Sequence, residues 1–276
     1  MLETISSMFS YGFLGRAVIV GVLVSLCAAL LGVSLVLKRY SMIGDGLSHV
    51  GFGALSVALV MNMSPLIVSI PVVVVAAILL LRISESSKIK GDAAIAVISS
   101  GSLAVGITVT ALTSGMNLDV NNYMFGSILA MSKNDVYISV GLTIVVLTAF
   151  VFLYNRIFAV TFDESFAKSV GTNAGFYNTL MAVLAAVTIV VGMRMMGALL
   201  ISSLIIFPAL TSMRIFKTFK SVVISSAVVS VVCFMAGMYL TVTTKVPAGP
   251  GIVLVNLAVF IVMWVIGKLK GKFSHR

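Results

Sequence analysis

Nine long stretches of this sequence carry almost no charge, and they limit the possible fold more than any other feature. They are 17 to 23 residues long, and Asp45 is their only Asp, Glu, Lys or Arg. They cover residues 17–37, 40–61, 65–81, 93–114, 136–154, 176–193, 195–213, 221–243 and 251–267. A helix of about 20 apolar residues crosses a bilayer, and these stretches do not alternate polar and apolar residues as the strands of a membrane barrel do. With 60% hydrophobic and 9% charged residues, the chain is predicted to be an all-α integral membrane protein. We expect a polytopic helical bundle of about nine transmembrane helices, within a range of eight to ten.

The basic residues between these stretches predict how the chain is oriented. The formal net charge is +10, but the lysines and arginines lie in short clusters between apolar runs, so they do not indicate a nucleic-acid-binding surface. An N-terminus outside the cell places 14 of the 18 lysines and arginines on the cytoplasmic side. The four left outside are Arg16, Lys133, Arg194 and Lys245. Because cytoplasmic segments are enriched in Lys and Arg, we expect an external N-terminus and a cytoplasmic C-terminus.

An acid and an imidazole interrupt the second stretch. Asp45 and His49 are spaced i, i+4, which places them on one face of a helix. A carboxylate in the middle of a bilayer costs roughly 2.5 to 3.5 kcal/mol, so it needs a compensating partner. A carboxylate oxygen and a neutral imidazole nitrogen are ligands for a divalent cation such as Zn²⁺ or Mn²⁺. The spacing is equally consistent with a structural role, in which the two side chains pair with each other or with backbone carbonyls.

Two ligands are too few for a closed metal site. If two copies of the chain meet on a twofold axis, a second Asp45 and His49 complete an N₂O₂ set that suits tetrahedral Zn²⁺. Bidentate carboxylates or water would allow a larger coordination number. The only other histidine, His275, lies in the basic C-terminal tail, where we expect it to be solvated.

Two segments between the stretches are too long to be simple turns. Residues 155–175 are expected in the cytoplasm, where Asp163 can cap a short helix and Gly171 can end it. The apolar residues that recur there at helical spacing are Phe162, Phe166 and Val170. Such a helix can dock into a groove of a partner, or it can connect two spans and pack on the protein's own surface, and the spacing does not decide between them.

The second long segment, residues 115–135, is expected outside the cell. It contains Tyr123, Phe125 and Gly126. Aromatic residues are enriched where a membrane meets water, so we interpret this segment as an interfacial anchor rather than as a gate.

Several of these motifs together resemble the ABC-3 family, the permeases of bacterial zinc, manganese and iron importers. Residues 38–49, which read K-R-Y-S-M-I-G-D-G-L-S-H, resemble the family's basic pair followed by G-D-A-L-S-H. The resemblance places Asp45 and His49 at the metal-coordinating positions. Residues 123–128 resemble the family's Y-L-F-G-S-I stretch, and residues 197–209 resemble its G-x-L-L with a downstream P-A.

The segment after the fifth stretch resembles the family's cytoplasmic coupling helix, which contacts an ATPase. The residues expected at this contact are Asp163, Glu164, Phe166, Ala167 and Gly171.

The chain departs from the family pattern at two places. After His49 it reads V-G-F-G and lacks the usual proline and glycine pair, so a proline kink is not expected there, although Gly51 and Gly53 allow a bend. Gly46 stands where alanine is usual. A glycine weakens a helix by up to about 1 kcal/mol but permits closer packing.

The resemblance implies a single transmembrane permease domain over residues 1–276, with residues 155–175 as its cytoplasmic coupling segment. It implies a homodimer in the bacterial plasma membrane, surrounded by lipid, that works with a cytoplasmic ABC ATPase and an extracytoplasmic metal-binding protein. The transported ion is expected to be Zn²⁺, Mn²⁺ or Fe²⁺, carried by alternating access.

The sequence has no G-x-x-x-x-G-K-[ST] loop, so the chain is not expected to be an enzyme, and ATP hydrolysis belongs to the separate subunit. One alternative is a permease for a metal chelate, a siderophore or a cobalamin-like cargo. Another is an ion-gradient-driven carrier in which Asp45 relays protons. A membrane-embedded metalloenzyme is not indicated, because no H-E-x-x-H motif is present.

Overall fold

Every regular element of the described chain is a helix. The computed structural model describes residues 12–86, 91–113, 126, 132–244 and 246–273. Its helices are α2 (Gly12–Leu37), α3 (Ile43–Val60), α4 (Pro65–Ser86), α5 (Gly91–Leu112), α7 (Lys133–Phe152), α8 (Tyr154–Phe162), α9 (Glu164–Ser169), α10 (Ala174–Met196), α11 (Ala198–Met213), α12 (Phe219–Thr244) and α13 (Ala248–Phe273). The predicted all-α fold is confirmed for this part of the chain.

Among the described residues, eight helices are long and apolar enough to cross a membrane. They are α2, α3, α4, α5, α7, α10, α12 and α13, and they match eight of the nine predicted stretches. The remaining stretch, residues 195–213, coincides with α11, which has only 16 residues. At 1.5 Å per residue, α11 is roughly 24 Å long and falls short of a hydrocarbon core of about 30 Å. Gly197, with a φ of 91°, separates it from α10.

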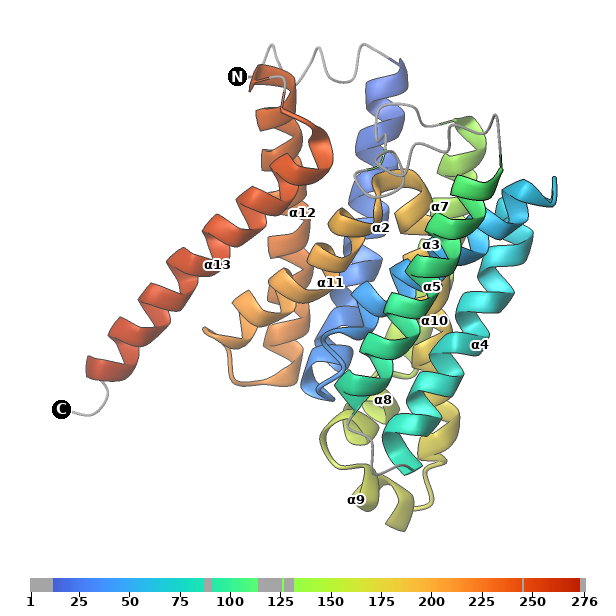
Figure 1. Ribbon diagram of the computed structural model, residues 1–276. Helices are drawn as coiled ribbons and strands as arrows, with labels where there is room; N and C mark the ends of the chain where they lie inside the picture. Colours follow the sequence, from blue (N-terminus) through green and yellow to red (C-terminus); the bar gives the residue numbers. More distant parts are fainter. Residues whose placement is uncertain (1–11, 87–90, 114–125, 127–131, 245, 274–276) are drawn as a thin grey trace.

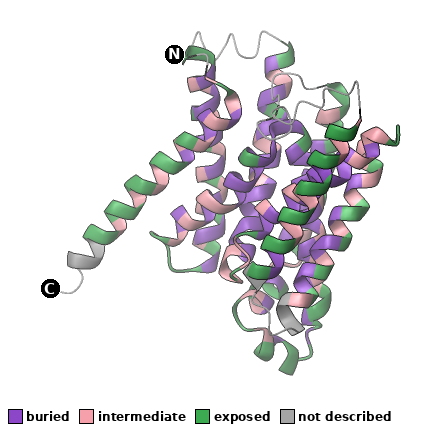
Figure 2. Ribbon diagram, in the orientation of Figure 1, coloured by how far each residue is buried: buried purple, intermediate pink, exposed green. Residues whose placement is uncertain are grey.

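Successive helices of the bundle run in alternating directions, so α2 begins and α13 ends at opposite ends of the molecule (Figure 1). Buried residues concentrate on α2, α3 and α10, whereas α13 packs beside α11 and α12 and has few buried residues (Figure 2). The exposed side chains of α13 include Leu254, Ile261 and Val265. Apolar side chains on a membrane helix suit contact with lipid.

Glycines bring the central helices close together. A Cβ atom added at Gly32 of α2 would lie 2.1 Å from the carbonyl oxygen of Ile205 in α11. A Cβ atom at Gly53 of α3 would lie 2.6 Å from the carbonyl oxygen of Ser102 in α5. Small residues favour helix association in lipid because they let two backbones approach. At these two crossings, the helices could not pack as they do with any larger residue.

The short helices α8 and α9 lie at the end of the bundle where α2 ends (Figure 1). A turn of four residues after Lys38 then leads into α3. The end of α2, the start of α3 and the two short helices therefore share one end of the molecule.

Candidate functional site

Asp45 and His49 lie close together on α3, as their spacing predicts. The Nε2 atom of His49 is 3.6 Å from the Oδ2 atom of Asp45. Well-formed N–H···O hydrogen bonds have a donor–acceptor distance of about 2.7 to 3.2 Å, so this distance is too long for one. The two side chains are neighbours but do not form a strong hydrogen bond with each other. The Asp45 side chain is 47% exposed and the His49 side chain is 18% exposed. Both side chains can therefore reach a third group.

Asp45 occupies the first turn of α3. The free N–H groups and the dipole at the start of a helix stabilise a negative charge by about 0.3 to 1 kcal/mol at exposed sites. Ser48, which is buried, donates a hydrogen bond of 2.7 Å to the carbonyl oxygen of Asp45. The position of Asp45 on its helix therefore offsets part of the cost that a carboxylate in an apolar span would carry.

One copy of the chain supplies a partial ligand set. Among the described residues, no group of three or more His, Cys, Asp or Glu side chains is placed to hold a metal ion. The carboxylate and imidazole of one α3 thus provide two ligands, where a structural Zn²⁺ site has four. Any metal held here needs further ligands from outside this set.

Gly46 lets α5 pack directly beside the acid. A Cβ atom added at Gly46 would lie 2.5 Å from Cγ2 of Ile95 in α5. The expectation that glycine at this position permits closer packing than alanine is confirmed by this contact. The backbone of α3 at Asp45 is therefore held against α5.

The predicted ends of the short helix α9 are confirmed. Asp163 has an extended backbone, with φ −145° and ψ 96°, and its side chain accepts a hydrogen bond of 2.9 Å from the backbone N–H of Phe166. Gly171 follows the helix with a φ of 80°, and its N–H bonds the carbonyl oxygen of Lys168 at 3.1 Å. An N-cap and a left-handed glycine therefore limit α9 to six residues.

The prediction that Phe162, Phe166 and Val170 share one helix face is wrong. Phe162 is the last residue of α8, and the extended backbone of Asp163 separates it from α9. Its ring packs against those of Phe158 and Phe219, with centroids 5.0 and 6.0 Å away. Phe162 and Phe166 are spaced as on a single helix, but Asp163 both ends α8 and begins α9, so the two residues lie on different helices. Phe166 and Val170 remain exposed.

Ala167 anchors α9 to the rest of the protein. It is fully buried and packs with Val160 of α8 and Ala174 of α10. Because Ala167 faces inward, α9 presents Phe166 outward to solvent or to a partner.

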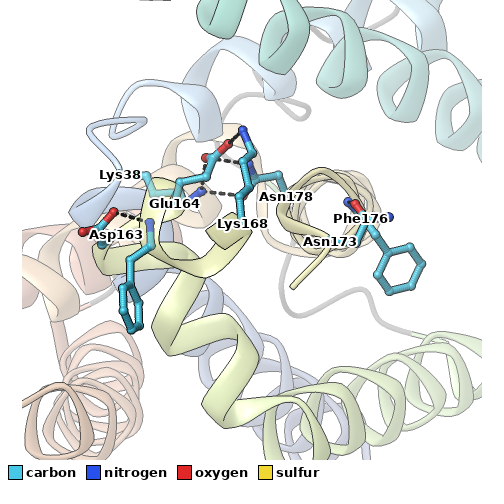
Figure 3. A network of polar contacts seen from close by, with 8 residues as sticks. Lys38, Asp163, Glu164, Lys168, Asn173, Phe176 and Asn178 are labelled. Atoms are coloured by element: carbon cyan, nitrogen blue, oxygen red, sulfur yellow. Dashed lines mark hydrogen bonds and ion pairs between the residues drawn. The ribbon is translucent and has the colours of Figure 1, made fainter. Parts of the chain in front are cut away.

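A polar network joins α9 to two other elements (Figure 3). The Oε1 atom of Glu164 lies 2.8 Å from Nζ of Lys168, and its Oε2 atom accepts a hydrogen bond of 2.9 Å from Nδ2 of Asn178 in α10. Nζ of Lys38, the residue that follows α2, lies 3.4 Å from Oε2 of Glu164 and donates a hydrogen bond to Oδ1 of Asn178. We call Lys38, Glu164, Lys168 and Asn178 the Glu164 network.

The network keeps Glu164 ionised. Partial burial raises the pKa of this carboxyl, but the hydrogen bonds from Lys168 and Asn178 lower it. The positive charges of Lys38 and Lys168 lower it further, and the resulting pKa of Glu164 is about 2. The carboxylate therefore holds its partners as an anion throughout the neutral pH range.

Sequence reasoning missed two members of this network. Lys38 was interpreted as a determinant of orientation and as part of a basic pair, and Asn178 as part of an apolar stretch. Asn178 is 4% exposed, and a buried amide needs hydrogen-bonding partners. Its presence in an otherwise apolar run was the available signal, but nothing in the sequence identifies Glu164 as the partner.

Four residues discussed above lie outside the described residues, namely Tyr123, Phe125, Lys245 and His275. Gly126 is described and has a φ of 70°. A Cβ atom there would lie 2.2 Å from the carbonyl carbon of Met196, next to the junction of α10 and α11. Gly126 therefore packs where no side chain fits, and the anchoring role of its segment stays a prediction.

Comparison with known proteins shows similarity along almost the whole chain. A model described as the ABC 3 transport family matches residues 10–267. The manganese import system permease protein ScaB of Streptococcus gordonii is 28% identical over 264 residues, which cover 96% of this chain and 95% of that protein. The high-affinity zinc uptake system membrane protein ZnuB of Haemophilus influenzae is 28% identical over 246 residues, which cover 89% of this chain and 94% of that protein.

A solved structure has the same arrangement of helices. PsaBC from Streptococcus pneumoniae in complex with Fab contains a chain that is similar with a TM-score of 0.84 and 28% identity. The similarity covers 95% of both chains. The likeness therefore extends over the bundle as a whole and is not confined to one motif.

Proposed function

The chain belongs to the ABC 3 transport family, and on this basis we propose that it is the membrane permease subunit of an ATP-driven importer of Zn²⁺ or Mn²⁺. The relatives described above are permease or membrane components of manganese and zinc systems, and they match over nearly their full lengths. The metal is the cargo, held only in transit. The charge distribution supports a location in the bacterial plasma membrane with the N-terminus outside.

Asp45 and His49 bind the ion within the membrane. The observation that carries this proposal is their geometry: a carboxylate and an imidazole lie 3.6 Å apart on one face of α3, and neither is fully buried. These two groups suit borderline divalent cations. Two copies of the chain in a dimer would supply two carboxylates and two imidazoles, which is a sufficient set for Zn²⁺.

The helix α9 links this subunit to a separate cytoplasmic ATPase. Phe166 is exposed on α9, and the exposed Val170 follows it, so an apolar contact surface is available. An external binding protein delivers the ion to the outer mouth of the permease. ATP binding then moves α9, and the long helices rock so that the metal site opens to the cytoplasm.

The test is metal uptake by cells that produce Asp45→Ala or His49→Ala permease together with the ATPase and the binding protein. We expect each variant to abolish uptake of radiolabelled zinc or manganese, because a ligand is lost from the transport path. Pull-down of the ATPase by the permease should stay at the wild-type level. Direct metal binding by the purified complex should fall in parallel with uptake.

Asp135→Asn is a matched control, because it also removes one carboxylate charge. Asp135 belongs to the capping box that begins α7, and asparagine keeps an acceptor there. Uptake by this variant should equal that of the wild type. Wild-type uptake in both Asp45→Ala and His49→Ala would show that the ion passes without these ligands and would end the proposal.

A further inference from the structure

The turn that carries Lys38 leads directly to the proposed metal site. Lys38 is the first residue after α2, and Asp45 follows seven residues later in the first turn of α3. The turn is tightly built: Arg39 has a φ of 64°, and the N–H of Tyr40 bonds the carbonyl oxygen of Leu35 at 2.9 Å. The N–H of Ile43, the first residue of α3, bonds the carbonyl oxygen of Tyr40 at 3.0 Å. A displacement of Lys38 therefore moves the start of α3 with it.

The other end of the connection lies on α9. Glu164 is its first residue, and this one carboxylate contacts groups from three parts of the chain. Lys38 comes from the end of α2, Asn178 from α10, and Lys168 from α9 itself. The apolar contacts that Ala167 of α9 makes, as described above, are with α8 and α10. The ion pair of Glu164 with Lys38 thus connects α9 to the turn before α3.

Breaking only one of the two hydrogen bonds of Asn178 is expected to cost free energy. Its amide is 4% exposed and uses Oδ1 to accept from Lys38 and Nδ2 to donate to Glu164. A buried amide that loses a partner pays the full cost of its lost hydration. The lysine, the glutamate and the asparagine are therefore expected to move as one unit when α9 moves.

We infer that the Glu164 network is a positioning device, which transmits the motion of α9 to the first turn of α3 and so to Asp45. This inference rests on the proposed function, because it assigns a role between the ATPase contact and the metal site. In this inference Lys38 and Asn178 act as positioning residues, and their role does not require contact with the ion or the ATPase. Partly exposed ion pairs contribute little to stability, so we expect the loss of the ion pair between Lys38 and Glu164 to alter coupling more than folding.

The experiment measures ions transported per ATP hydrolysed, using the complete complex of permease, ATPase and binding protein in proteoliposomes. For Lys38→Met we expect this ratio to fall by about tenfold, within the 5- to 150-fold range typical of coupling between sites. ATPase capture and metal binding by the purified complex should stay at wild-type values, whereas the melting temperature should fall somewhat because buried Asn178 loses the donor to its Oδ1 atom. Lys38→Arg, which keeps the charge, should restore most of the ratio. A structural role alone would change the melting temperature and leave the ratio unchanged.

Two controls are matched to these residues. Lys217→Met removes an exposed lysine just before the start of α12, and Asn155→Leu removes an exposed asparagine of α8. Both should keep the wild-type ratio, whereas Asn178→Leu should lower it as Lys38→Met does. The exchange of charges in Lys38→Glu with Glu164→Lys should recover part of the ratio that either single change loses. This comparison decides the matter if Lys38→Met fails to assemble.

Failure of the inference can be told apart from failure of the proposed function. If Asp45→Ala abolishes transport and Lys38→Met leaves the ratio unchanged, the network does not couple the two sites and the inference is wrong. The inference is also wrong if the charge exchange recovers none of the ratio that the single changes lose. If Asp45→Ala transports normally, the proposed function itself fails.

Discussion

Asp45 and Glu164 are acids that the protein holds in opposite ways. Among the described residues, Asp45 has one ion-pair or metal-ligand type of neighbour, the imidazole of His49 on its own helix at 3.6 Å, and about half of the Asp45 side chain is exposed. Glu164 contacts three side chains, two of them 126 and 14 residues away in the sequence. An acid with few partners keeps lone pairs for a visiting cation. An acid with a complete set of partners cannot take a cargo, but it can fix the relative positions of the elements that surround it.

The largest effect is expected for metal transport through the two-ligand site on α3, and it tests whether Asp45 needs ligands from a second copy. Cells that produce a wild-type copy and an Asp45→Ala copy with different tags yield mixed dimers by two-step purification. Because one site shared by both copies needs both carboxylates, we expect the mixed dimer to transport almost no metal. A complete site within each copy would leave about half of the wild-type rate, and that result would contradict the shared site.

The next effect tests whether the site depends on the close packing of α3. In Gly53→Ala the new methyl would lie 2.6 Å from the Ser102 carbonyl oxygen, and such overpacking costs about 1 to 3 kcal/mol. We expect a lower melting temperature and reduced uptake. Gly101→Ala on the facing helix α5 is the control, since no atom lies within 4 Å of its Cβ position. It should keep or raise the melting temperature, as alanine favours a helix by about 0.5 to 1 kcal/mol.

A smaller effect tests the region around Glu164. Asp163→Ala removes the side-chain acceptor that begins α9, at a cost of about 0.5 to 2 kcal/mol. We expect α9 to fray and the ATPase to be captured less well, while metal binding through Asp45 stays unchanged. Asp163→Asn keeps the acceptor and should behave as the wild type. Equal capture of the ATPase by the alanine and asparagine variants would show that the cap has no part in this contact.

The smallest effect is the response of Glu164 to acid. Its pKa in the folded protein is about 2, below the ordinary value of 4.5. A lowered pKa means that the carboxylate stabilises the fold above pH 4.5 and that this contribution is lost as the pH falls towards 2. Between these values the wild type should lose melting temperature faster than Glu164→Gln, by a small amount because the side chain is 31% exposed. If the melting temperatures of the wild type and Glu164→Gln fall in parallel between pH 4.5 and 2, the ionised Glu164 does not stabilise the fold.

Sequence reasoning succeeded where a feature depends on local spacing. Eight of the nine predicted apolar stretches form helices of full spanning length, because a membrane requires a minimum length of apolar helix. Asp45 and His49 are one turn apart, so their proximity follows from helix geometry alone. The cap at Asp163 and the left-handed glycine at Gly171 are likewise local preferences.

Sequence reasoning failed where a feature depends on contacts between distant segments. Lys38 and Asn178 are 140 residues apart, and no periodicity predicts that they share a hydrogen bond. Phe162 follows the same spacing as Phe166, yet its ring packs on Phe219 of α12. Tertiary packing decided these cases, and helical spacing by itself carried no information about it.

The position of Lys38 also bears on how its variants are synthesised. The machinery that inserts membrane helices acts before tertiary contacts exist, and it responds to the summed positive charge of the flanking loops. In the proposed orientation, Lys38 is one of 14 lysines and arginines on the cytoplasmic side, against four on the other. Its loss leaves this asymmetry nearly unchanged. We therefore expect a defect in a Lys38 variant to arise in the finished transporter and not during its biogenesis.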